Sequence, residues 1–162
     1  MFHRNGLLRI ARAVARCGVL VGLRHLLHCP SQIMPRLILQ PDGSALCGQC
    51  CIAMAAGVSL RTVVNVCGES PEGMGTDEVR RGLLHFGIPT ARRMHPVKDR
   101  GLGRMNTGRA ILHTKQSGAK CGHWSLLWDG AILDPGGPYT ALYFPTQIVS
   151  YLRIFKMLPT HP

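Results

Sequence analysis

Apolar residues in the first half of the chain recur at helical spacing. The apolar run over residues 50–58 contains Ala and Met, which are strong helix formers, so it predicts a buried helix that begins just before Cys47. Ser59 is placed to cap a second, short helix, and Gly68 to end it. A third helix is predicted with Thr76 as its N-cap and two acidic residues in its first turn, where the helix dipole favours negative charge.

The second half of the chain carries shorter apolar runs of extended character. Strands are predicted over residues 109–115, within 121–135 and over 151–158, and a short strand followed by a turn is predicted earlier, over 36–43. Helices that precede the strands, rather than alternate with them, indicate an α+β domain. In such a domain we expect N-terminal helices packed on a C-terminal antiparallel sheet.

A hairpin signal lies in the second of these extended segments. Asp129-Gly130 between apolar runs predicts a two-residue type I′ turn, in a register that pairs Leu126 with Leu133. One face of the hairpin is then shared by His123, Ser125, Leu127, Ile132 and Asp134. In that register His123 and Asp134 are diagonal neighbours on the paired strands, with about 7–8 Å between their backbones. A carboxylate fixes the tautomer of an imidazole and stabilises its protonated form, so the hairpin predicts a His–Asp pair.

The formal net charge of +11 is concentrated at the N-terminal end of the chain. Residues 1–36 hold six arginines and no acid, whereas the remaining 126 residues hold 13 basic against 8 acidic residues, a net charge of +5. Nothing beyond the N-terminal segment has the form of a recognition helix, an aromatic and basic RNA platform or a zinc finger. Specific nucleic-acid binding is therefore not expected.

Residues 1–33 differ in character from the rest of the chain. They are rich in Arg, lack acids and have apolar residues at roughly helical spacing, as in an organellar presequence or a membrane-surface helix. No apolar run approaches the roughly 18 residues that span a bilayer. We therefore interpret residues 1–33 as a basic N-terminal extension, the only part expected to contact a membrane, and residues 34–162 as one domain.

The chain has seven cysteines, an odd number that a complete disulfide framework cannot use. A domain of this length does not need disulfides for stability either. We therefore expect a reducing compartment, the cytoplasm, and a monomeric protein whose thiols are mostly small buried apolar groups.

Three of the cysteines, Cys47, Cys50 and Cys51, lie within five residues at the start of the first predicted helix. Cys47 and Cys50 have the C-x-x-C form of a dithiol oxidoreductase, but a turn sequence precedes them where a thioredoxin fold has a strand. With Cys121 and His123 the same two thiols would form a Cys₃His zinc site, although C-x-H on a strand is a weak half-motif.

The third interpretation makes Cys47 a nucleophile. At a helix N-terminus the first-turn amides and the dipole favour a thiolate, with His123 as its base and Asp134 as the orienting acid. The backbone amide of Cys47 would donate one hydrogen bond to an oxyanion. Gln40, seven residues upstream, would donate the second.

Taken in order, Gln40, "CGQCCIAMAAG", "GTDEVRRGLLHFGI" and "GHWSLLWDGAILDP" resemble papain-like cysteine peptidases. The most similar group is the bacterial family that removes double-glycine leaders from bacteriocins, with its stand-alone relatives. The resemblance covers nearly all of residues 38–158. It implies a papain-like α+β fold and a peptidase that acts on a peptide or protein without a cofactor.

The resemblance also implies roles for single residues. Cys47 matches the nucleophile, His123 the general base, Asp134 the orienting acid and Gln40 the oxyanion side chain. Alignment with papain itself would place the nucleophile at Cys50, but Cys-Gly followed by Ala-Met matches the leader-peptidase helix and favours Cys47. The interval from Gln40 to Cys47 is one residue longer than in the family. A catalytically silent version of the fold, acting as a binding module, is the alternative from another functional class.

Overall fold

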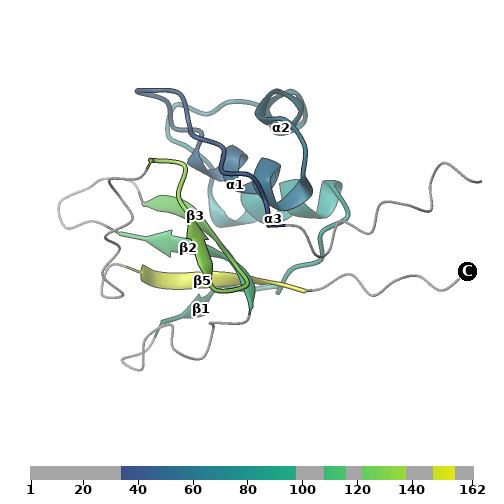
Figure 1. Cartoon of the computed structure of the whole chain (residues 1–162), viewed down its shortest axis with the longest axis vertical. Helices are drawn as coiled ribbons and strands as arrows, with labels where there is room; N and C mark the ends of the chain where they lie inside the picture. The colour runs from purple at the N-terminus through teal and green to yellow at the C-terminus, as the bar shows by residue number, and fades with distance from the viewer. Residues whose placement is uncertain (1–33, 98–107, 116–121, 138–147, 156–162) are drawn as a thin grey trace, which may run out of the picture.

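The computed structural model describes residues 34–97, 108–115, 122–137 and 148–155. The predicted extension over residues 1–33 lies outside them, so the domain boundary remains a prediction. The described residues form three helices followed by five strands, and the helices gather on one side of the sheet (Figure 1). The prediction of an α+β domain with N-terminal helices on an antiparallel sheet is confirmed.

Local sequence features explain where the three helices form and end. They are α1 (Cys47–Ala56), α2 (Leu60–Cys67) and α3 (Thr76–His85). Nine of the ten residues of α1 are buried, which explains its nearly continuous apolar sequence. As predicted, the Ser59 hydroxyl caps α2 by accepting from the Thr62 amide at 3.1 Å, and Gly68 ends that helix.

The predicted start of α3 is wrong by one residue. Gly75, not Thr76, is its N-cap, and Thr76 is its first helical residue. The Glu78 carboxylate accepts a hydrogen bond from the Gly75 amide at 2.7 Å. A Glu at the third helical position stabilises an N-cap in this way, so the cap needs no side chain of its own.

The strands form one antiparallel sheet in the order β1-β5-β2-β3-β4. Their bounds are β1 His95–Pro96, β2 Arg109–Thr114, β3 His123–Trp128, β4 Ala131–Leu133 and β5 Ile148–Ile154. The last strand begins three residues before the predicted one, because Ile148 still pairs with Thr114 of β2. The two-residue strand β1 has no counterpart among the predictions, because its Pro is unfavourable for a strand except at a sheet edge.

The strand predicted within residues 36–43 does not form, although the turn after it does. Ser44 donates its amide to the Pro41 carbonyl at 3.0 Å, which closes the turn. Before the turn, the Gln40 amide donates to the Pro135 carbonyl at 2.9 Å. Proline has no N–H with which to return a hydrogen bond, so a ladder cannot continue at this point.

The core lies between the helices and the sheet. Its fully buried members come from both layers and include Ile52, Val79, Leu83, Ile111, Leu126 and Leu152. A second, smaller cluster on the other face of the sheet contains Ala110, Leu112, Leu127 and Ile148. Strand β3 therefore contributes alternate side chains to the two clusters, as the pleat of a strand requires.

Among the described residues, no single helix is both long enough and apolar enough to span a membrane. Helices α1 and α2 meet these criteria only when taken together, and they are bent by 117° relative to each other.

Candidate functional site

The β3–β4 hairpin positions two of the predicted site residues. Asp129 and Gly130 have φ values of 47° and 97°, the positive φ at both central residues that a type I′ turn requires. The predicted register is confirmed, with Leu126 opposite Leu133. Arg109 of β2 anchors the turn through a hydrogen-bonded ion pair with the Asp129 carboxylate at 2.9 Å.

His123 and Asp134 meet at the open end of this hairpin. The Nε2 atom of His123 lies 2.7 Å from Oδ1 of Asp134, and the Gly136 amide donates to the same oxygen at 2.7 Å. Asp134 is buried, with 6% of its side chain exposed, whereas His123 exposes 28% of its side chain. Cys47 interacts with the same ring, since hydrogen bonding to its side chain is among the causes that raise the pKa of His123.

The predicted shared face does not describe the final position of the His123 ring. Leu127, expected on the same face, packs with Ala110 and Leu112 in the cluster away from the helices. The His123 ring instead reaches Cys47 at the start of α1. His123 is the first residue of β3 and pairs with Thr114, the last residue of β2. Because the ladder ends here, the His123 side chain can turn around the end of the strand towards the helix.

The environment of His123 changes its proton affinity. Burial alone would lower its pKa, but hydrogen bonds to Asp134 and Cys47, together with the negative charges of these groups, raise the pKa from 6.5 to about 9. At neutral pH the His123 ring is therefore an imidazolium.

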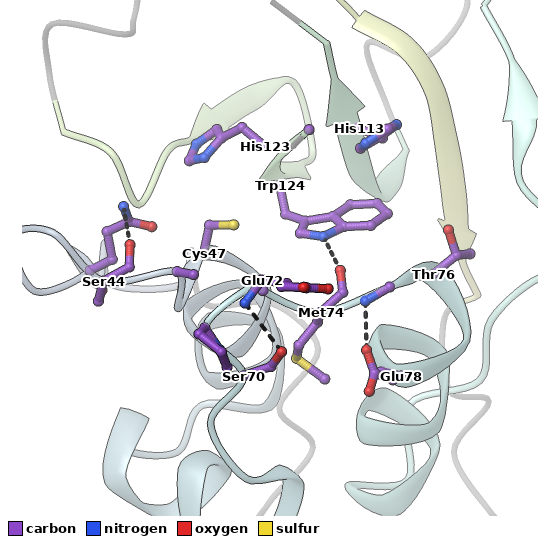
Figure 2. Close-up of a pocket in the computed structure, with 16 residues that line it drawn as sticks. Ser44, Cys47, Ser70, Glu72, Met74, Thr76, Glu78, His113, His123 and Trp124 are labelled. Atoms are coloured by element: carbon purple, nitrogen blue, oxygen red, sulfur yellow. Dashed lines mark hydrogen bonds between the residues drawn. The ribbon is translucent and has the colours of Figure 1, made fainter. Parts of the chain in front are cut away.

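Of the three clustered cysteines, Cys47 reaches the cavity, with 7% of the residue exposed. It lies at the first position of α1 and lines a cavity of about 950 Å³ together with His123, and Figure 2 shows its side chain beneath the His123 ring. Cys50 and Cys51 are fully buried in the core. Burial, with the charge of Cys47 as a second cause, raises the pKa of Cys50 to about 12. Burial likewise raises the pKa of Cys51 well above its usual value.

Gln40 lines the same cavity as Cys47 and His123. Its side-chain Nε2 donates to the Ser44 carbonyl at 3.3 Å, across the turn that precedes α1. Its Oε1 is buried and has no hydrogen-bond partner among the described residues. The four predicted site residues thus come together, Asp134 through its bond to His123 and the other three at the cavity itself.

Three further residues of the cavity were not identified as site residues from the sequence. Trp124 donates its indole N–H to the Met74 carbonyl at 2.8 Å, and His113 packs on the Trp124 ring with a centroid distance of 4.6 Å. All three line the cavity (Figure 2). The sequence Gly-His-Trp indicates a candidate catalytic histidine, but nothing in it indicates which loop or strand the Trp side chain contacts.

The same geometry explains the glycine before His123. A Cβ at Gly122 would overlap Nε2 of His113, so the His113 ring occupies the place of a side chain at position 122. We expect Gly122→Ala to lower the free energy of unfolding by roughly 1–3 kcal/mol, as overpacking does. In a His113→Ala background most of this loss should disappear, because the clashing ring is gone. Denaturant unfolding of the four variants in this cycle measures the coupling, and an equal loss in both backgrounds would contradict it.

In the described part of the chain, no group of three or more His, Cys, Asp or Glu side chains is arranged to hold a metal ion. Cys121, a member of the Cys₃His set considered from the sequence, lies outside the described residues.

Comparisons with known proteins were made for family, sequence and structure. No protein-family model matches the chain. No curated protein matches it in sequence. Among solved structures, the chain is similar to the peptidase domain of Streptococcus ComA, a bi-functional ABC transporter involved in a quorum-sensing pathway. The TM-score is 0.57 at 17% sequence identity, over 76% of this chain and 97% of that domain. The likeness shows that this chain has a papain-like α+β fold.

Proposed function

We propose that the protein is a cysteine hydrolase that cleaves a peptide or amide bond with Cys47 as its nucleophile. The observation that carries the proposal is the grouping of the three side chains: the His123 ring lies 2.7 Å from the Asp134 carboxylate, and Cys47 and His123 line one cavity. A nucleophile, a base and a group that orients the base are the parts that covalent acyl transfer requires.

In this reaction the Cys47 sulfur attacks the carbonyl carbon of the substrate while its proton resides on His123. The tetrahedral intermediate collapses when His123 gives that proton to the leaving amine, and a thioester on Cys47 remains. A water molecule then attacks the thioester carbon and loses a proton to His123. Collapse of the second intermediate releases the carboxylic acid and returns the proton to the Cys47–His123 pair.

The oxyanion of each intermediate needs hydrogen-bond donors. The first amides of α1 have no partner within the helix and point out of its N-terminus, beside the Cys47 sulfur. We assign the second donor to Gln40. One hydrogen of its Nε2 is directed to the Ser44 carbonyl, so the other is available to a ligand in the cavity.

Burial supports Cys47 over its neighbours in this role. A thiol nucleophile must ionise, and the raised pKa of about 12 opposes ionisation of Cys50. The same property argues against a dithiol oxidoreductase that uses Cys47 and Cys50, because the resolving thiol must also ionise and meet its partner. Because Cys47 must stay reduced to act, we place the reaction in a reducing compartment such as the cytoplasm.

The substrate class follows from the fold and the chemistry together. The similar solved structure, from Streptococcus ComA, is a peptidase domain. The cavity of about 950 Å³ in this protein is large enough for several residues of an extended peptide. A peptide or protein substrate therefore fits this site best.

Thiol labelling tests the proposal directly. At pH 6 an ordinary thiol is almost entirely protonated and reacts slowly with iodoacetamide. We expect Cys47 to be alkylated at least about tenfold faster than glutathione under these conditions, with the site mapped by mass spectrometry. Incubation with a peptide library should show cleavage that iodoacetamide abolishes. Ordinary reactivity of Cys47 together with no cleavage would favour a catalytically silent binding module.

A further inference from the structure

Opposite the β3 strand, the cavity is bounded by the segment Gly73–Gly75, which connects the region after α2 to α3. The Gly73 amide donates to the Ser70 carbonyl at 3.0 Å, and the Gly75 amide donates to the Glu78 carboxylate at 2.7 Å. The Met74 side chain lies directly over Gly48 of α1, where an added Cβ would come within 3.0 Å of the Met74 Cβ. This segment therefore forms a wall of the cavity that Cys47 and His123 also line.

One side chain joins this wall to the strand that carries His123. Trp124 follows His123 in β3, is only 5% exposed, and donates its indole N–H to the Met74 carbonyl at 2.8 Å (Figure 2). The two residues are 50 positions apart in the chain. A buried indole N–H and a buried carbonyl each need a partner, so this hydrogen bond is costly to break.

His113 prevents the indole from moving away. Its ring packs on Trp124 at a centroid distance of 4.6 Å, with the planes tilted by 38°. The same ring fills the space above Gly122, as described for the Gly122→Ala variant. His113 of β2 therefore lies against Gly122 and Trp124, the two residues that flank His123, and holds the Trp124 ring in the orientation that meets Met74.

We propose that Trp124 is a positioning residue, whose hydrogen bond to the Met74 carbonyl sets the width of the cleft between the Gly73–Gly75 wall and the Cys47–His123 pair. Its effect on peptide cleavage rests on the proposed function. Its effect on access to Cys47 rests on geometry alone. In an acyl transfer the reacting atoms must be held about 3–3.5 Å apart, and a displacement of about 1 Å can lower the rate a hundredfold.

The proposal separates two kinds of reagent. A small electrophile such as iodoacetamide needs only the Cys47–His123 pair. The Trp124 indole N–H bonds the Met74 carbonyl and not this pair, so its loss should leave the reaction with iodoacetamide unchanged. A large reagent such as fluorescein maleimide must pass between the two walls. Without the hydrogen bond, we expect the segment to move away from β3 rather than towards α1, because Met74 already lies against Gly48. A wider cleft should therefore admit the large reagent more readily.

The test compares Trp124→Phe with Trp128→Phe. Trp128 lies on the same strand and the same side of the sheet and is 6% exposed, but it belongs to the other end of the core, where Arg109 covers its ring. For Trp124→Phe we expect the ratio of maleimide to iodoacetamide labelling at Cys47, mapped by mass spectrometry, to rise at least about fivefold. For Trp128→Phe the ratio should stay within twofold of the wild type. A ratio that is unchanged or lower in Trp124→Phe, or equal in the two variants, would overturn the proposal.

A second measurement addresses catalysis. With a peptide that the wild type cleaves, Trp124→Phe should lower kcat/KM at least about tenfold, and Trp128→Phe should change it less than threefold at a similar loss of thermal stability. Equal kcat/KM values in the two variants would overturn the positioning role. If the wild type cleaves no peptide and Cys47 is labelled only at the rate of an ordinary thiol, the proposed function fails, and the labelling ratio still decides whether Trp124 sets the width of the cleft.

Discussion

Replacement of Cys47 by Ala should lower kcat/KM for peptide cleavage at least about 10³-fold, because neither neighbouring thiol, Cys50 or Cys51, can take its place as nucleophile. Cys50 and Cys51 follow Cys47 closely in the sequence, but both are fully buried in the core. The loss of activity should far exceed any loss of stability, because Cys47, like Cys50, is buried and its replacement deletes a single sulfur from the core. Rapid labelling at pH 6 should disappear in the same variant.

Cys50→Ala is the matched control for this result. It removes a thiol three residues away on the same helix, and we expect kcat/KM to stay within about threefold of the wild type, with a moderate loss of stability because a buried sulfur is deleted. If Cys50→Ala and Cys47→Ala abolish activity equally, both thiols take part in the reaction. The dithiol interpretation would then replace the hydrolase.

Asp134→Asn should have the second largest effect. The carboxylate accepts the hydrogen bond of the His123 ring at 2.7 Å and contributes to its raised pKa of about 9. Without that charge, we expect the pKa of His123 to fall towards its ordinary value of 6.5, which NMR titration of the ring protons would measure. Hydrolysis should slow by about 10²- to 10⁴-fold, as when a base loses its orienting partner.

The pH dependence follows from the direction of this shift. The active pair contains an imidazolium, so the rate should fall as pH rises through about 9 in the wild type, and at a lower pH in Asp134→Asn. Because the folded-state pKa of His123 is raised, its pairing stabilises the protein fully below about pH 6.5, and this contribution is lost as pH rises through about 9. The gap in unfolding midpoint between wild type and Asp134→Asn should therefore be larger at pH 6 than at pH 10. A gap that widens at high pH would show that Asp134 stabilises the fold in another way.

Local chemistry explains which parts of the structure could be predicted. The Ser59 cap and the Asp129-Gly130 turn depend on a few neighbouring residues, and both occur where the sequence places them. The hairpin register follows from the turn, so His123 and Asp134 could be expected to meet. The residue that caps α3 was misplaced because Gly75 and Thr76 are both acceptable caps, and only the Glu78 contact decides between them.

The orientation of the His123 ring shows the limit of such reasoning. Strand periodicity places it on the face away from the helices, with Leu127, yet the ring reaches Cys47. Periodicity describes directions within a regular strand and does not determine how a side chain turns at the first residue. The partner on α1 lies 76 positions earlier in the sequence, and its closeness depends on how the helix packs on the sheet.

The sequence alone predicts three helices followed by strands, the hairpin and the residues able to carry out thiol chemistry, because these depend on local propensity and residue type. It wrongly predicts a strand within residues 36–43 and does not predict β1. The tertiary structure decided which of Cys47, Cys50 and Cys51 faces the cavity, since burial is a property of the packed helix and not of its composition. It also brought Trp124 to Met74 and His113 to Gly122. Contacts between elements so far apart in the chain arise only when the helices and the sheet pack together, and no local pattern encodes them.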